Sequence, residues 1–175
     1  LQVSAKLVVL FYFWHSLFCI VFFLYVNKYG GDAVTYLTPG GVFDNRPFKL
    51  GTVAVIYTVR FLQEFGLSGI GISLCFNMLG VIGGLYLYSA LTSLNVNKDV
   101  FISRIILFFL FFPSLSFWSS GVGKDSVSFL SIAMAIYAFT EQKPNFRLLL
   151  FSFFLMLLVR PHIAGIMLIA FALSV

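Results

Sequence analysis

Long apolar runs with few charged residues dominate this chain. The first covers residues 5–26, and the next full-length run covers residues 67–94. A helix of about 20 apolar residues crosses the hydrocarbon core of a bilayer. Such runs fold as helices because lipid cannot satisfy exposed backbone groups. Further apolar runs cover residues 100–119, 126–140, 147–160 and 163–175. The sequence therefore predicts an all-α fold, a polytopic bundle of transmembrane helices.

Composition supports this interpretation. Of the 175 residues, 61% are hydrophobic and 10% are charged, whereas a soluble domain carries about a quarter charged residues. The net charge of +5 does not indicate nucleic acid, because the basic residues stand singly between the apolar runs. Cys19 and Cys75 lie inside apolar runs, which indicates neither a disulfide nor a metal site. We therefore expect membrane lipids, and no nucleic acid, around this chain.

The segment between the first two spans is different. It is rich in Gly and Pro and carries Asp32 and Asp44. Residues 52–65 then form an apolar stretch that Arg60 and Glu64 interrupt, a pattern typical of a helix lying in the membrane interface. We expect an outer-face loop and an interfacial helix here. Because the chain ends inside an apolar run, we expect residues 1–175 to be the N-terminal part of one larger transmembrane domain.

Counting spans places many polar residues on one side of the membrane. If Lys6 is cytoplasmic, the opposite side receives a set of acidic and basic side chains: Asp32, Asp44, Lys124, Asp125, Arg160 and His162. Several follow runs that are short for a full crossing, so we expect them to line a recess. The alternative is that they are ordinary loop charges and helix caps. For Asp125 that alternative is a helix start.

A recess of this kind suits a phosphate-bearing, lipid-linked substrate. Arg160 and Lys124 would hold phosphate oxygens, and a carboxylate would take the proton of an attacking hydroxyl. His162 would donate to the phosphate or pack beside the preceding proline. Tyr36 and Trp118 would stack on a sugar or an isoprene unit, although aromatic residues are common at membrane interfaces in any case.

Several short motifs carry a family resemblance. They are GDAVTY at 31–36, FPS at 112–114, FWSSGVGKD at 117–125 and VRPH at 159–162. Together with the order of span, outer loop, interfacial helix and second span, these motifs make the chain similar to bacterial polytopic glycosyltransferases of the GT-C superfamily. The likeness is greatest to dolichyl-phosphate-mannose mannosyltransferase-like and surface-polysaccharide-assembly members.

The resemblance implies an enzyme of the bacterial inner membrane that transfers a sugar from a polyprenyl-phosphate-linked donor. It implies that Asp32 is the catalytic base, with Asp44 as the second candidate. Many relatives carry paired acids in this loop, and the acidic residue of the family acts as a base or binds a metal. Here Ala33 follows Asp32, so the paired motif is absent and a divalent metal ion stays open. The missing C-terminal part would shape the acceptor site, so this part alone should be inactive.

The residues alone leave two other functions open. An exopolysaccharide or O-antigen repeat-unit polymerase has similar hydropathy and basic outer loops. A transporter or flippase would use Arg160 and Asp32 as gates for its substrate. Inverted repeats would favour transport, and the sequence shows no internal repeat.

Overall fold

A computed structural model describes residues 3–38, 47–95, 99–140 and 144–174. Within these ranges all regular structure is helical and no strand is present, in agreement with the predicted fold class. The helices are α1 (Ala5–Tyr29), α2 (Asp32–Leu37), α3 (Thr52–Glu64), α4 (Gly69–Leu94), α5 (Val100–Leu110), α6 (Pro113–Ser120), α7 (Lys124–Thr140), α8 (Phe146–Val159) and α9 (Pro161–Ser174).

Two of these helices are long and apolar enough to cross a membrane. They are α1 and α4, with 25 and 26 residues. Helices α5 and α6 reach the necessary length only as a pair, bent by 42° at the break between them, and would make a third span. Helices α8 and α9 are apolar but have 14 residues each. The described structure thus contains two or three candidate spans, fewer than the six that the apolar runs suggest.

The bend between α5 and α6 divides the predicted run 100–119. Pro113 is the first residue of α6, where its missing N–H costs no helical hydrogen bond. A continuous helix through this position would lose a hydrogen bond and clash with the proline ring. Phe112 therefore takes an extended conformation (φ −69°, ψ 122°), as residues before proline prefer. The outcome is a short second helix aimed in a new direction.

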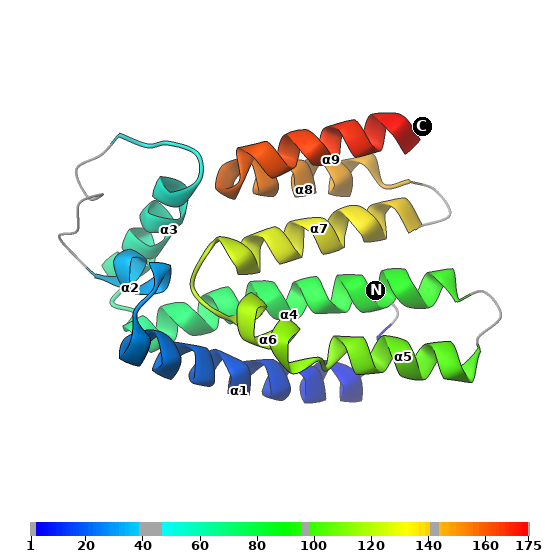
Figure 1. The fold of residues 1–175 in the computed structure, drawn as a ribbon, viewed down its shortest axis with the longest axis horizontal. Helices are drawn as coiled ribbons and strands as arrows, with labels where there is room; N and C mark the ends of the chain where they lie inside the picture. The colour runs from blue at the N-terminus through cyan, green and yellow to red at the C-terminus, as the bar shows by residue number, and fades with distance from the viewer. Residues whose placement is uncertain (1–2, 39–46, 96–98, 141–143, 175) are drawn as a thin grey trace.

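The long helices run alternately in opposite directions (Figure 1). Helix α4 is central and contacts α1, α5, α6 and α7, while α8 packs on α7 and α9 packs on α8. Helices α2 and α3 lie at the end of the bundle where α4 and α7 begin and α8 ends (Figure 1). We call this the α2–α3 end. The alternation returns the chain to it several times.

Three glycines let other helices approach α4 closely. A Cβ atom on Gly80 would collide with the backbone of Ser119 in α6 and with the ring of His15 in α1. One on Gly83 would lie 3.0 Å from Cα of Leu130 in α7, and one on Gly84 would overlap a ring in α1. These three small residues thus allow close helix packing, as small residues commonly do in membrane bundles.

Helix α3 forms over nearly the predicted range, 52–65. Its first turn is buried on all sides, and the buried residues of the helix are Val53, Ala54, Val55, Ile56 and Val59. At its other end α3 is tied to α2, because Gln63 Nε2 donates to the carbonyl of Leu37 at 2.9 Å and Arg60 donates to that of Thr38 at 2.5 Å. Helices α2 and α3 therefore form one connected unit.

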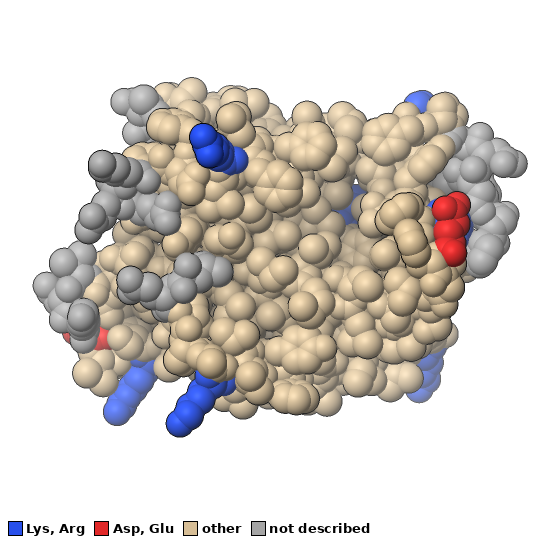
Figure 2. Space-filling view, turned by 180° about the vertical axis from the view of Figure 1, so that it is seen from behind, with Lys and Arg blue, Asp and Glu red and all other residues tan. Residues whose placement is uncertain are grey.

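On the face drawn in Figure 2, few charged side chains lie between the two ends of the bundle. Figure 2 shows Lys, Arg, Asp and Glu side chains mainly toward the ends of the long axis, with a broad band of other residues between them. Large apolar side chains in α1, α5, α8 and α9 are widely exposed, among them Leu24 at 62%, Phe101 at 70% and Leu150 at 68%. Lipid would solvate such a band far better than water.

The close contact at Gly80 leads to a stability prediction. Gly80→Ala should destabilise the protein by about 1–3 kcal/mol, because the added methyl group overpacks the contact with α6. Thermal unfolding of the purified protein in detergent measures this as a lower Tm. Gly165→Ala is the matched control, since nothing lies within 4 Å of a Cβ at Gly165 in α9. An equal Tm for the two variants would contradict close packing of α4 against α6.

Candidate functional site

Side chains from four separate segments meet at the α2–α3 end of the bundle. They come from the start of α2, the start of α3, the start of α7 and the end of α8, which the alternating helices bring to one place (Figure 1). The residues are Asp32, Tyr36, Thr52, Lys124, Asp125 and Arg160. We call this group the polar cluster.

An ion pair joins α7 to the end of α8 in the polar cluster. Arg160 Nη2 donates to Asp125 Oδ1, and the two side chains are 31% and 52% exposed. Pro161 ends α8, so Arg160 leaves the helical conformation (φ −145°, ψ 76°). Asp125 lies in the first turn of α7, where the helix dipole also stabilises its charge. The pair is accessible, so an incoming anion could compete with Asp125 for Arg160.

A second contact joins α7 to the start of α3. Lys124 Nζ donates to Thr52 Oγ1 at 3.0 Å. Beside it, the backbone N–H of Gly51 donates to the carbonyl of Leu158 at 2.6 Å and connects the start of α3 to the end of α8. Three helices are thus linked around the two cations, Lys124 and Arg160.

Asp32 and Tyr36 form the α2 side of the polar cluster. The Tyr36 hydroxyl points to Asp32 Oδ2 over a long contact of 3.4 Å. The pKa of Tyr36 is raised to about 12, chiefly by burial and also by the charge and the hydrogen bond of Asp32 and the charge of Asp125, while the charge of Arg160 acts in the opposite direction. The side chain of Tyr36 is 2% exposed, whereas Asp32 is exposed. Asp32 is therefore an accessible carboxylate that faces a buried phenol.

The structure brings together some, but not all, of the residues singled out in the sequence. Asp32, Tyr36, Lys124, Asp125 and Arg160 form the polar cluster with Thr52, which the sequence did not single out. A single threonine after a glycine at the start of a helix does not by itself predict a functional residue. Of the six residues expected to line one recess, four lie in this cluster, namely Asp32, Lys124, Asp125 and Arg160.

The remaining predicted residues lie elsewhere. His162 is exposed in the first turn of α9, and within the described part of the chain its side chain makes no hydrogen bond or ion pair. Trp118 is 56% exposed on α6 and reaches the cluster only through a groove that it shares with Asp125. Asp44 lies outside the described residues.

The polar cluster does not provide a metal site within the described ranges. No group of three or more His, Cys, Asp or Glu side chains there is close enough to hold a metal ion. Of its two carboxylates, Asp125 is already paired with Arg160 and Asp32 faces Tyr36. These residues do not fit a divalent ion.

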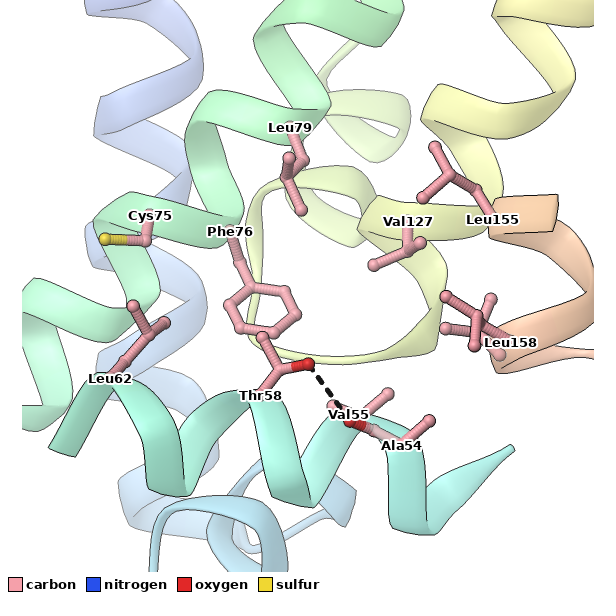
Figure 3. Close-up of a pocket in the computed structure, with 11 residues that line it drawn as sticks. Ala54, Val55, Thr58, Leu62, Cys75, Phe76, Leu79, Val127, Leu155 and Leu158 are labelled. Carbon is pink, nitrogen blue, oxygen red and sulfur yellow. Dashed lines mark hydrogen bonds between the residues drawn. The ribbon is translucent and has the colours of Figure 1, made fainter. Parts of the chain in front are cut away.

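The bundle contains an apolar cavity of about 280 Å³ (Figure 3). Its walls come from α3, α4, α7 and α8, and the lining residues are Ala54, Val55, Thr58, Leu62, Cys75, Phe76, Leu79, Val127, Leu155, Leu158 and Val159. The Thr58 hydroxyl donates to the carbonyl of Ala54 at 3.0 Å, so it is already satisfied (Figure 3). Val159 directly precedes Arg160, so the cavity lies next to the ion pair.

A more polar groove lies on the other side of Asp125, between α6 and α7. It has a volume of about 530 Å³ and is lined by Phe112, Ser114, Leu115, Trp118, Ser119, Asp125 and Phe129. The Asp125 carboxylate and the exposed Trp118 indole thus border the same space. An aromatic surface beside hydrogen-bonding groups suits a hydroxylated ligand.

Comparisons with family models, curated proteins and solved structures give no match to this chain. The resemblance to GT-C glycosyltransferases therefore rests on the short sequence motifs and on the order of the segments along the sequence.

The surroundings of Tyr36 lead to a pH prediction. Because the pKa of Tyr36 is about 12 in the folded chain and its ordinary value is 10.0, folding favours the protonated phenol. This contribution to stability is fully present below pH 10 and should be lost as the pH rises from about 10 to about 12. The tyrosinate absorbance of the native protein minus that of Tyr36→Phe should show one phenol titrating near pH 12. A phenol titrating near pH 10 would contradict the buried position beside Asp32.

Proposed function

We propose that this chain forms the donor site of a membrane glycosyltransferase that takes a sugar from a polyprenyl-phosphate-linked donor. The observation that carries the proposal is the meeting of Asp32, Lys124, Asp125 and Arg160 at one end of the bundle, beside an apolar cavity. Such a donor has an apolar chain, an anionic phosphate and a hydroxylated sugar. The apolar cavity would suit the chain, the two cations the phosphate, and the groove beside Trp118 the sugar. The motifs that resemble GT-C enzymes support the same reaction.

The proposal includes an arrangement in the membrane. Helices α1 and α4 and the α5–α6 pair would each cross it, and α7, α8 and α9 would cross in shorter or tilted form. Helix α3 would lie in the interface. The α2–α3 end would then face outward from a bacterial inner membrane. The apolar band between the two ends of the bundle supports this arrangement (Figure 2).

The phosphate would bind between Lys124 and Arg160. Arg160 offers planar paired donors and Lys124 a compact charge, which together suit phosphate oxygens. In the free protein Arg160 is paired with Asp125, and Lys124 donates a hydrogen bond to Thr52. A phosphate with its larger charge would displace these partners. The isoprenoid chain would enter the cavity beneath α3, and the sugar would reach the groove that Trp118 borders.

Asp32 is the better catalytic base of the two carboxylates in the cluster. Asp125 is neutralised by Arg160, whereas no cation is bonded to Asp32 within the described residues. Asp32 would take the proton of an acceptor hydroxyl while its oxygen bonds to the anomeric carbon of the donor. The bond from that carbon to the phosphate oxygen breaks, and the phosphate leaves with the bonding electrons, held by the two cations. Attack from the opposite side inverts the configuration of the sugar.

Replacing Asp32 tests this role. Asp32→Asn in the full-length protein should lower sugar transfer by roughly 100- to 10,000-fold, because an amide cannot accept the proton. Transfer from a radiolabelled polyprenyl-phosphate sugar in isolated membranes measures the loss. Asp99→Asn is the control, since Asp99 caps α5 at the opposite end of the bundle and Asn also caps well.

Both variants should insert into the membrane at the wild-type level. Unchanged transfer by Asp32→Asn would remove Asp32 as the base and leave Asp44 as the candidate. Absence of transfer from any polyprenyl-linked sugar by the wild-type protein would overturn the proposed function itself.

A further inference from the structure

A group of hydrogen-bonded polar side chains lies inside the bundle, away from the polar cluster. His15 is 1% exposed, Asn77 is not exposed at all and Ser119 is 3% exposed. They come from α1, α4 and α6, and apolar side chains such as Phe11 pack around them. Polar groups inside a membrane protein are costly unless they are paired, and buried polar residues there usually serve a function.

His15 connects the three helices. Asn77 Nδ2 donates to Ser16 Oγ at 2.9 Å, so the Asn77 carbonyl oxygen faces the imidazole. His15 Nδ1 therefore donates to Asn77 Oδ1, at 2.5 Å, and His15 Nε2 lies 3.0 Å from Ser119 Oγ. One imidazole ring thus uses both nitrogens, one toward α4 and one toward the last turn of α6.

Helix α6 depends on these contacts for its position. It has eight residues, and the 42° bend separates it from α5. A second hydrogen bond from α1 holds it, from Trp14 Nε1 to Ser116 Oγ at 3.1 Å. The absence of a side chain at Gly80 lets α4 touch the backbone of Ser119. The face of α6 that carries Ser116 and Ser119 is therefore fixed by side-chain hydrogen bonds as well as by packing.

The end of α6 leads directly into the polar cluster. Gly121, Val122 and Gly123 follow it, all buried, and α7 then begins with Lys124 and Asp125. The loop has little freedom to absorb a movement of α6, because the ring of Phe22 in α1 fills the space beside Gly121. A shift or rotation of α6 would therefore move Lys124 and Asp125 relative to α3 and α8.

We propose that His15 and Asn77 are positioning residues for the polar cluster. By fixing α6 through Ser119, they set the place of Lys124 against Thr52 and of Asp125 against Arg160. The consequence for sugar transfer rests on the proposed function, but the structural effect does not. Simple packing of helices by polar side chains is the competing explanation. It predicts that losing His15 loosens the whole bundle equally.

Cross-linking of cysteine pairs separates the two explanations without any assay of activity. In the full-length protein with Cys19 and Cys75 replaced, one pair is Thr52→Cys with Lys124→Cys, which reports on the polar cluster. The other pair, Ser131→Cys with Ser152→Cys, joins α7 to α8 where Ser131 Oγ now donates to the Ser152 carbonyl at 2.6 Å. It serves as the matched control.

His15→Leu should slow cross-linking of the 52–124 pair by about fivefold, the effect of losing roughly 1 kcal/mol of interhelical hydrogen bonding. The 131–152 pair should cross-link at its usual rate. His15→Gln should restore much of the 52–124 rate, because its side-chain amide oxygen can still accept a hydrogen bond from the Ser119 hydroxyl. Ser119→Ala should resemble His15→Leu, and it tests the same link if the Leu variant fails to insert. The proposal would be overturned if His15→Leu and Ser119→Ala both left the 52–124 cross-linking rate unchanged. It would also be overturned if the 52–124 and 131–152 pairs were slowed equally.

Discussion

The need to satisfy every backbone group inside a non-aqueous solvent governs this structure. Helices meet that need within a single segment, and short connections then force neighbouring helices to run in opposite directions. The chain consequently returns to the α2–α3 end after α1, before α4, before α7 and after α8 (Figure 1). Residues far apart in sequence, such as Asp32 and Arg160, thereby come to act on the same phenol, Tyr36.

Around this arrangement the polar contacts divide into two layers. At the α2–α3 end, Asp125 with Arg160 and Lys124 with Thr52 join helices whose side chains remain accessible. Deeper in the bundle, His15 and Asn77 join α1, α4 and α6 in fully buried contacts. The outer layer is partly exposed at the surface, whereas the inner layer is closed. We infer that the inner layer holds the outer one in place.

Much of this could be predicted from the sequence, because hydropathy fixes where helices lie and their alternation fixes which ends meet. The helical class, the helix near 52–65 and the grouping of Lys124, Asp125 and Arg160 with Asp32 all follow from that reasoning.

The features that the sequence could not predict also have physical reasons. Pro113 marks the break within 100–119, but hydropathy could not show the direction in which α6 continues, because that direction depends on how α6 packs on α1. Nor could it show which polar residues pair, such as Thr52 with Lys124 or His15 with Asn77, since pairing depends on rotation of each helix about its axis.

The central claim is that the polar cluster forms one site on one face of a membrane. Cysteine accessibility in intact cells tests it most directly, with single cysteines at 32, 124 and 160 and, at the opposite end of the bundle, at 99 and 145, after replacement of Cys19 and Cys75. A membrane-impermeant thiol reagent added outside should label positions 32, 124 and 160 and leave 99 and 145 unlabelled until the cells are opened. Labelling of 32 and 160 from opposite sides of the membrane would contradict a single site on one face.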